Sequence, residues 1–172
     1  MEHFYKNIGG VYFNFEDFYK NIVAPNMVDG DHIVEIGGWD GKSVSFLGVE
    51  IANSNKAISY DVIVSMPDGD SFNTFIQNTD PVKNYFNLIR SSESDVAASC
   101  EDNSLSLVFL DNVVSEQAVT ASIQTWLPKV KTGGILAGDD YGEVDWPGVK
   151  NAVNANLAGF SVIGTTWIYV KN

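Results

Sequence analysis

Short apolar runs alternate along the chain with longer segments in which apolar residues recur every three or four positions. The short runs are rich in Ile, Val, Leu and Phe and are bounded by Gly, Asn, Asp or Ser, a pattern typical of buried strands. They cover residues 32–37, 56–64, 84–91, 104–111 and 133–139. The tail, residues 160–172, predicts two more strands that turn near Gly164 and form a hairpin.

The segments between these runs predict helices. Asn14 can cap a first helix, which Pro25 stops. Further helices are predicted over residues 41–53, 116–130 and 148–157, with a weaker one at 72–77. Strands that alternate with helices form a mostly parallel sheet covered on both faces. We therefore predict one doubly wound α/β domain over residues 1–172, with about seven strands, the first near the centre, and a C-terminal antiparallel hairpin.

Composition narrows the range of partners. The formal net charge is -12 and the pI is about 4.3, so the chain would repel a nucleic acid backbone or an anionic membrane surface. Cys100 is the only cysteine and fits a reducing compartment. We expect both histidines, His3 and His32, to be surface or packing residues rather than catalysts. With no apolar segment of membrane-spanning length and no leader pattern, we predict a cytoplasmic protein that acts on a small molecule.

The stretch "HIVEIGGWDGKS" places an acid at the end of the first strand and glycines directly after it. Glu35 is that acid, and Ser43 enters the first turn of the next helix. The glycines, which let a backbone turn tightly and approach a ligand, are Gly37, Gly38 and Gly41. This arrangement is typical of a nucleotide cradle, although a tight turn without any ligand is the simpler alternative.

The spacing in this turn distinguishes between nucleotide cofactors. Trp39 stands where a dinucleotide fingerprint has its second glycine, and a pyrophosphate needs close approach at that point. NAD is therefore disfavoured. Asp61, expected at the end of the second strand, can accept hydrogen bonds from ribose hydroxyls. A cofactor that combines a ribose with a positively charged group and has no phosphate at this point is S-adenosylmethionine, which the pattern therefore suggests.

Six pieces of the chain, in order, resemble class I S-adenosylmethionine-dependent methyltransferases, close to a small group with a "VEIG...G.S" turn and a "DDY" motif. They are "VEIGGWDGKS", "ISYD", "LIRSSES", "SLSLVFLD", "WLPKVKTGGILAGDDYGEVDWPGVKNAV" and "TTWIYVKN". The resemblance implies a seven-stranded Rossmann-like methyltransferase sheet. It also implies that Ser92 and Glu93 lie along the adenine and that Asp111 lies beside the reacting centre. Together with the turn, the predicted cofactor-binding residues are Glu35, Gly37, Gly38, Trp39, Gly41, Ser43, Asp61, Ser92, Glu93 and Asp111.

Asp111, Asp139 and Asp140 are expected at the same edge of the sheet, where adjacent parallel strands end. Three carboxylates suit Mg²⁺, which would orient and activate a hydroxyl of the acceptor. The resemblance supports this, because metal-dependent O-methyltransferases also place acids after the fourth and fifth strands. Asp111 and Asp139 are the predicted catalytic residues. The alternative is that one acid caps a turn and the others are solvated.

The chain also departs from the family pattern. Relatives often have "DGDHSYEAV" where this chain has "DNVVSEQAV", so Val113 and Val114 replace an acid and a histidine. No general base is evident, and Glu116, Asp145 or a metal-bound hydroxide are the alternatives.

Three functions follow in order of preference. The first is O-methylation of a small hydroxylated molecule, with or without Mg²⁺. The second is a methyltransferase-like binding protein that has lost its chemistry, and the third is a nicotinamide-dependent oxidoreductase. Trp39 and Trp146 are expected either to line the cofactor and acceptor pockets or to pack. A homodimer that closes the pocket is left open.

Overall fold

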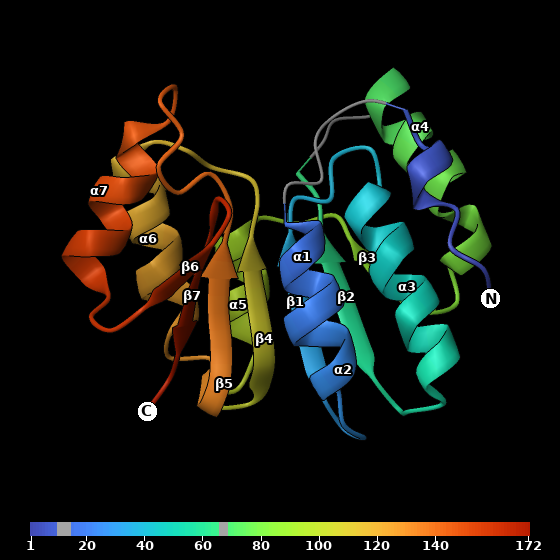
Figure 1. Ribbon diagram of the computed structural model, residues 1–172, viewed down its shortest axis with the longest axis horizontal. Helices are drawn as coiled ribbons and strands as arrows, with labels where there is room; N and C mark the ends of the chain where they lie inside the picture. Colours follow the sequence, from blue (N-terminus) through green and yellow to red (C-terminus); the bar gives the residue numbers. More distant parts are fainter. Residues whose placement is uncertain (10–14, 66–68) are drawn as a thin grey trace.

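The computed structural model describes residues 1–9, 15–65 and 69–172. Seven strands form one sheet in the order β3-β2-β1-β4-β5-β7-β6 (Figure 1). They are β1 (His32–Ile36), β2 (Ser59–Ile63), β3 (Asn87–Ile89), β4 (Leu105–Leu110), β5 (Val130–Gly138), β6 (Ser161–Ile163) and β7 (Thr166–Val170). Strands β1 to β5 are parallel to one another, and β7 is antiparallel to both β5 and β6. The predicted fold is confirmed.

The helices begin with a short 3-10 turn, η1 (Tyr5–Asn7). Three segments then follow one another without a break: α1 (Glu16–Phe18), the π-helix η2 (Tyr19–Val23) and α2 (Ala24–Asn26). The remaining helices are α3 (Lys42–Ser54), α4 (Asp70–Thr79), the 3-10 turn η3 (Asp80–Val82), α5 (Glu93–Ser99), α6 (Glu116–Trp126) and α7 (Pro147–Asn156). None of the helices in the described ranges is long and apolar enough to cross a membrane.

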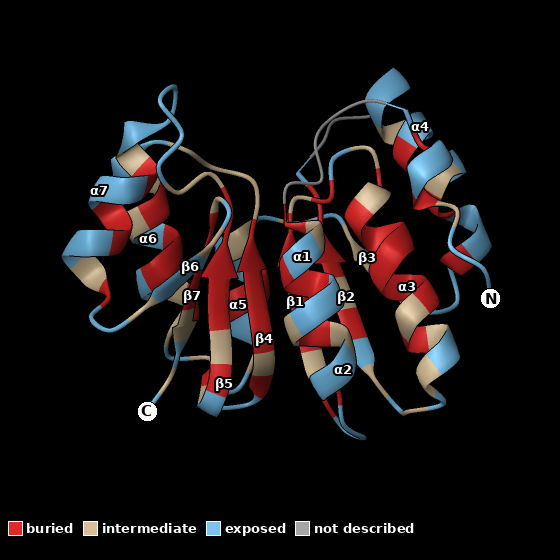
Figure 2. Ribbon diagram, viewed as in Figure 1, coloured by how far each residue is buried: buried red, intermediate tan, exposed pale blue. Residues whose placement is uncertain are grey.

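The sheet has a core on each face, because successive side chains of a strand point to opposite sides. Ile33 and Leu107 belong to the cluster under the N-terminal helices, α3 and α4. Their neighbours Val34 and Val108 belong to the cluster under α5, α6 and α7. The buried positions lie along the central strands and the inner sides of the helices (Figure 2). The sheet is therefore covered by helices on both faces, which leaves its strand ends as the places where a ligand can approach.

Several boundaries differ from the sequence expectation. The strand expected over 56–64 covers only Ser59–Ile63, so Asp61 lies in its middle. The weak helix expected at 72–77 is the longer α4. Helix α5 was not predicted, although Ser92 accepts a hydrogen bond from the Asp95 amide, as an N-cap residue does. The expected cap Asn14 lies outside the described residues.

Candidate active site

The glycine turn connects β1 to α3 at the carboxyl edge of the sheet. Gly37 has φ +124° and Gly41 has φ +83°, values that L side chains rarely adopt. A Cβ at Gly37 would lie 2.4 Å from the main-chain oxygen of Asp111, and one at Gly41 would lie 2.5 Å from Cγ2 of Thr79. These two glycines are therefore required by close packing against the end of β4 and against α4, whether or not a ligand is bound.

Glu35 lies beneath this turn and is fully buried. Its Oε1 accepts a hydrogen bond from Ser43 Oγ at 2.5 Å. Its Oε2 accepts hydrogen bonds from the hydroxyls of Tyr19, at 2.7 Å, and Tyr60, at 2.5 Å. Burial raises the pKa of Glu35, although the three hydroxyl donors act in the opposite direction. The carboxyl thus joins η2, β2 and α3, and its contact with a cofactor, like that of Ser43, stays a prediction.

Asp61 does not lie where the sequence placed it. It pairs in register with Val34, in the middle of β1. Its carboxylate lies 2.7 Å from Nε2 of His32 and accepts a hydrogen bond from Asn87 at 2.8 Å. Burial would raise the pKa of Asp61, but the bonds from His32 and Asn87 and the charge of His32 lower it overall. Because His32 begins β1, this pair lies toward the amino ends of the strands, and the prediction that Asp61 ends its strand is wrong.

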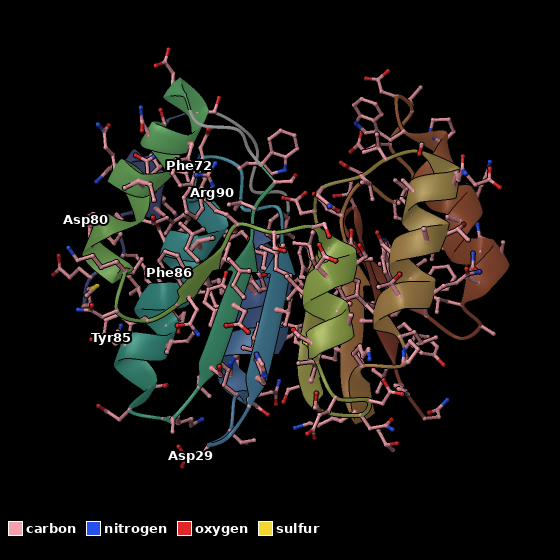
Figure 3. The ribbon with its side chains drawn as sticks, turned by 180° about the vertical axis from the view of Figure 1, so that it is seen from behind. Asp29, Phe72, Asp80, Tyr85, Phe86 and Arg90 are labelled. Carbon is pink, nitrogen blue, oxygen red and sulfur yellow. The ribbon has the colours of Figure 1, made fainter. Side chains whose placement is uncertain are left out.

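The positions that do follow β2 and β3 form a hollow of about 540 Å³, lined by Val64, Ser65, Arg90, Ser91 and Ser92. The guanidinium of Arg90 lies 4.2 Å from the centroid of the Phe72 ring, and Figure 3 shows the two side chains beside each other. Ser92 therefore lines a hollow at the expected edge. Ser65, Arg90 and Ser91 were missed, although each follows a predicted strand or lies at its end.

Glu93 makes structural contacts instead. Its Oε1 accepts a hydrogen bond from the indole of Trp126 at 2.6 Å, and its Oε2 accepts one from Asn112 at 3.4 Å. These bonds join the start of α5 to α6 and to the segment after β4. The role of Glu93 at the adenine stays a prediction.

Asp111, Asp139 and Asp140 follow β4 and β5, as predicted. Burial raises the pKa of Asp111 well above its usual range, with contributions from Glu35, Asp139 and Asp140. Burial also raises the pKa of Asp139, although Thr165 Oγ1 donates a hydrogen bond to it at 2.5 Å. Burial and the charges of Asp139 and Glu143 raise the pKa of Asp140 to about 6. The acids therefore influence one another at one edge of the sheet.

The same three acids are the predicted ligands of Mg²⁺. Within residues 1–9, 15–65 and 69–172, no group of three or more His, Cys, Asp or Glu side chains is arranged to hold a metal ion. The assignment of Asp111, Asp139 and Asp140 as Mg²⁺ ligands stays a prediction.

Trp39 connects the glycine turn to the end of β4. It has φ +38° and is 55% exposed. Its indole N–H donates a hydrogen bond to the main-chain oxygen of Asp111 at 2.8 Å. Trp146, 44% exposed, lies just before α7. Both tryptophans are therefore more exposed than packing residues of the core.

The residues considered as alternative bases lie at the start of helices. Glu116 begins α6 and is exposed, and it accepts a hydrogen bond from Asn151 at 3.0 Å. Asp145 is exposed and precedes α7. Val113 and Val114 pack partly against the core cluster of α5, α6 and α7. Neither Glu116 nor Asp145 is buried at the carboxyl edge, and no general base is assigned to either of them.

Comparison with known proteins agrees with this geometry. Residues 34–141 match a family model described as a methyltransferase domain, which covers more than half of the chain. The chain belongs to this methyltransferase family, and the predicted relationship to class I methyltransferases is confirmed. No curated protein matches the chain.

Solved structures share the fold at low identity. A candidate caffeoyl-CoA O-methyltransferase from Staphylococcus aureus is 17% identical, with a TM-score of 0.66 over 97% of this chain and 87% of that one. The O-methyltransferase NovP is 18% identical, with a TM-score of 0.61 over 88% of this chain and 75% of that one. MycE of the mycinamycin biosynthetic pathway, in complex with Mg, SAH and mycinamycin VI, is 15% identical, with a TM-score of 0.67 over 97% of this chain and 52% of that one.

Proposed function

We propose that this protein transfers the methyl group of S-adenosylmethionine to a hydroxyl of a small molecule. The observation that carries the proposal is the match of residues 34–141 to a methyltransferase domain. It is supported by the glycine turn, which lies beside Asp111 at the carboxyl edge where ligands of doubly wound sheets bind.

The donor is proposed to lie along this edge from β4 to β3. The backbone of the glycine turn, with Trp39, would contact the methionine part, and the hollow lined by Ser65, Arg90 and Ser92 would take the adenosine. The hydroxyls there can bond to ribose and adenine, and the stacked Arg90 and Phe72 offer a flat wall. Asp61 is not favoured as the ribose ligand, because it is already bonded to His32 and Asn87.

In the reaction, the acceptor oxygen attacks the methyl carbon in line with the carbon–sulfur bond. The electrons of that bond pass to sulfur, which leaves as the neutral thioether of S-adenosylhomocysteine, and the acceptor loses its hydroxyl proton. We assign that proton to the acids after β4 and β5, with Asp111 and Asp139 as the proposed catalytic residues. Because their pKa values are raised, the ionised forms of these carboxyls are stronger bases than ordinary carboxylates. Alignment of the two substrates would supply most of the acceleration.

Calorimetric titration with S-adenosylmethionine, followed by mass spectrometry of a panel of phenols, catechols and sugars, tests the proposal. We expect saturable binding of the donor and a methylated product for at least one acceptor class. Binding without turnover of any acceptor would instead support a binding protein that has lost its chemistry, which Val113 and Val114 favour. Binding of reduced nicotinamide cofactor but not of S-adenosylmethionine would overturn the proposal. Light scattering of the same sample tests the homodimer.

A further inference from the structure

Trp39 has a backbone conformation with positive φ, which glycine adopts more easily than tryptophan does. It has φ +38°, in a turn that contains three glycines with positive φ. A non-glycine residue in this region costs on the order of 1–3 kcal/mol and persists where the surroundings impose it, often at functional sites. The unusual backbone conformation of Trp39 therefore points to a functional role for its indole ring.

The ring is held in place yet leaves much of its surface uncovered. The indole N–H bonds to the main-chain oxygen of Asp111 at 2.8 Å, whereas 55% of the residue remains exposed. The bond crosses from the end of β1 to the end of β4. It thus fixes an aromatic surface at the centre of the carboxyl edge, where the strand order reverses and ligands of such sheets bind.

The surroundings of this ring favour a positive charge. Asp111 follows β4 beside the turn, and it interacts electrostatically with Glu35, Asp139 and Asp140. The side chains that donate hydrogen bonds to Glu35 and Asp139 do so through hydroxyl groups, which do not neutralise a carboxylate. A cation close to Trp39 would gain from these acids and from the π-system of the indole, since tryptophan is the best cation–π partner among side chains.

We propose that the indole of Trp39 packs against the positively charged sulfonium of the methyl donor and makes the protein bind the donor in preference to its neutral thioether product. This inference rests on the proposed function and adds a specific role for one residue. Methyl transfer removes the positive charge from sulfur, so the contact with Trp39 weakens in the same step. Trp39 thereby assists release of S-adenosylhomocysteine.

The test is the ratio of the dissociation constants of S-adenosylhomocysteine and S-adenosylmethionine, measured by calorimetry for wild type, Trp39→Leu and Trp39→Phe. Trp39→Leu removes the π-system, and we expect the preference for the donor to fall by about two- to fivefold. Trp39→Phe keeps an aromatic face but loses the bond to Asp111, so we expect it to retain more of the preference. Trp146→Leu, which changes the exposed tryptophan just before α7, serves as the matched control and should leave the ratio unchanged.

The outcomes separate the two proposals. If wild type binds both ligands but Trp39→Leu leaves their ratio unchanged, the role of Trp39 is overturned and the proposed function stands. If wild type binds neither ligand, both are overturned. Circular dichroism and thermal unfolding of each variant establish that it is folded, and the ratio cancels any loss of affinity common to both ligands.

Discussion

The hydroxyl of Tyr19 donates a hydrogen bond to Glu35 at 2.7 Å, joining the π-helix of the N-terminal segment to the end of β1. Both residues are fully buried. Tyr60 donates to the same carboxylate oxygen from β2. With Ser43 of α3, three separate segments therefore donate hydrogen bonds to the Glu35 carboxyl beneath the glycine turn.

Tyr19→Phe should destabilise the fold by about 1–3 kcal/mol, because it removes a donor from a buried carboxyl that cannot reach water. Urea unfolding followed by circular dichroism measures the change. Tyr85→Phe, at a tyrosine that is 36% exposed, is the control and should have little effect. Equal stabilities of wild type and Tyr19→Phe would show that this bond contributes nothing.

Asp61→Asn should leave the affinity for S-adenosylmethionine within about twofold of wild type, because Asp61 contacts His32 and Asn87 rather than the carboxyl edge. Arg90→Met should weaken donor binding by roughly three- to tenfold, because it removes the guanidinium that lines the hollow proposed for adenosine. Calorimetry measures both affinities. The opposite order, with Asp61→Asn losing binding, would restore Asp61 as the ribose ligand.

Asp140→Asn should stabilise the protein near pH 7.5 and have little effect near pH 4. The pKa of Asp140 is raised from 3.8 to about 6, so the folded state binds more protons than the unfolded state between these values. Stability from this group is fully present below about pH 4 and is lost as the pH rises through about 6. Thermal unfolding from pH 4 to pH 8 measures the difference, with Asp145→Asn as control. A constant difference between Asp140→Asn and wild type across this range would contradict the assignment.

If Asp111, Asp139 and Asp140 bind Mg²⁺ as predicted, millimolar MgCl₂ should raise the melting temperature and the affinity for the donor. A ligand that binds the folded state would raise its stability by mass action. Differential scanning fluorimetry with MgCl₂, and with NaCl at matched ionic strength, makes the comparison. A rise specific to Mg²⁺ that Asp139→Asn abolishes would support the predicted metal ligands, and equal melting temperatures in the two salts would contradict them.

The sequence by itself determined the architecture. Apolar runs separated by helical segments admit a parallel sheet covered on both faces, and the pattern around Gly164 requires a hairpin at its end. The order of the predicted strands also placed Asp111 and Asp139 at the same edge of the sheet, because the carboxyl ends of adjacent parallel strands meet there. These conclusions depend on periodicity and chain order, which are local properties of the sequence.

Only the tertiary structure decided which side chains face the site. Strand β2 pairs with β1 over Ser59–Ile63, and this register places Asp61 beside His32 instead of at the edge. The space that a Cβ would need at Gly37 and Gly41 is occupied by Asp111 and Thr79, which come from other segments. The carboxyl of Glu35 accepts hydrogen bonds from hydroxyl groups of three different elements. Strand ends, and the partners of a side chain, depend on pairing and packing between segments far apart in the chain. Local pattern alone does not decide either of them.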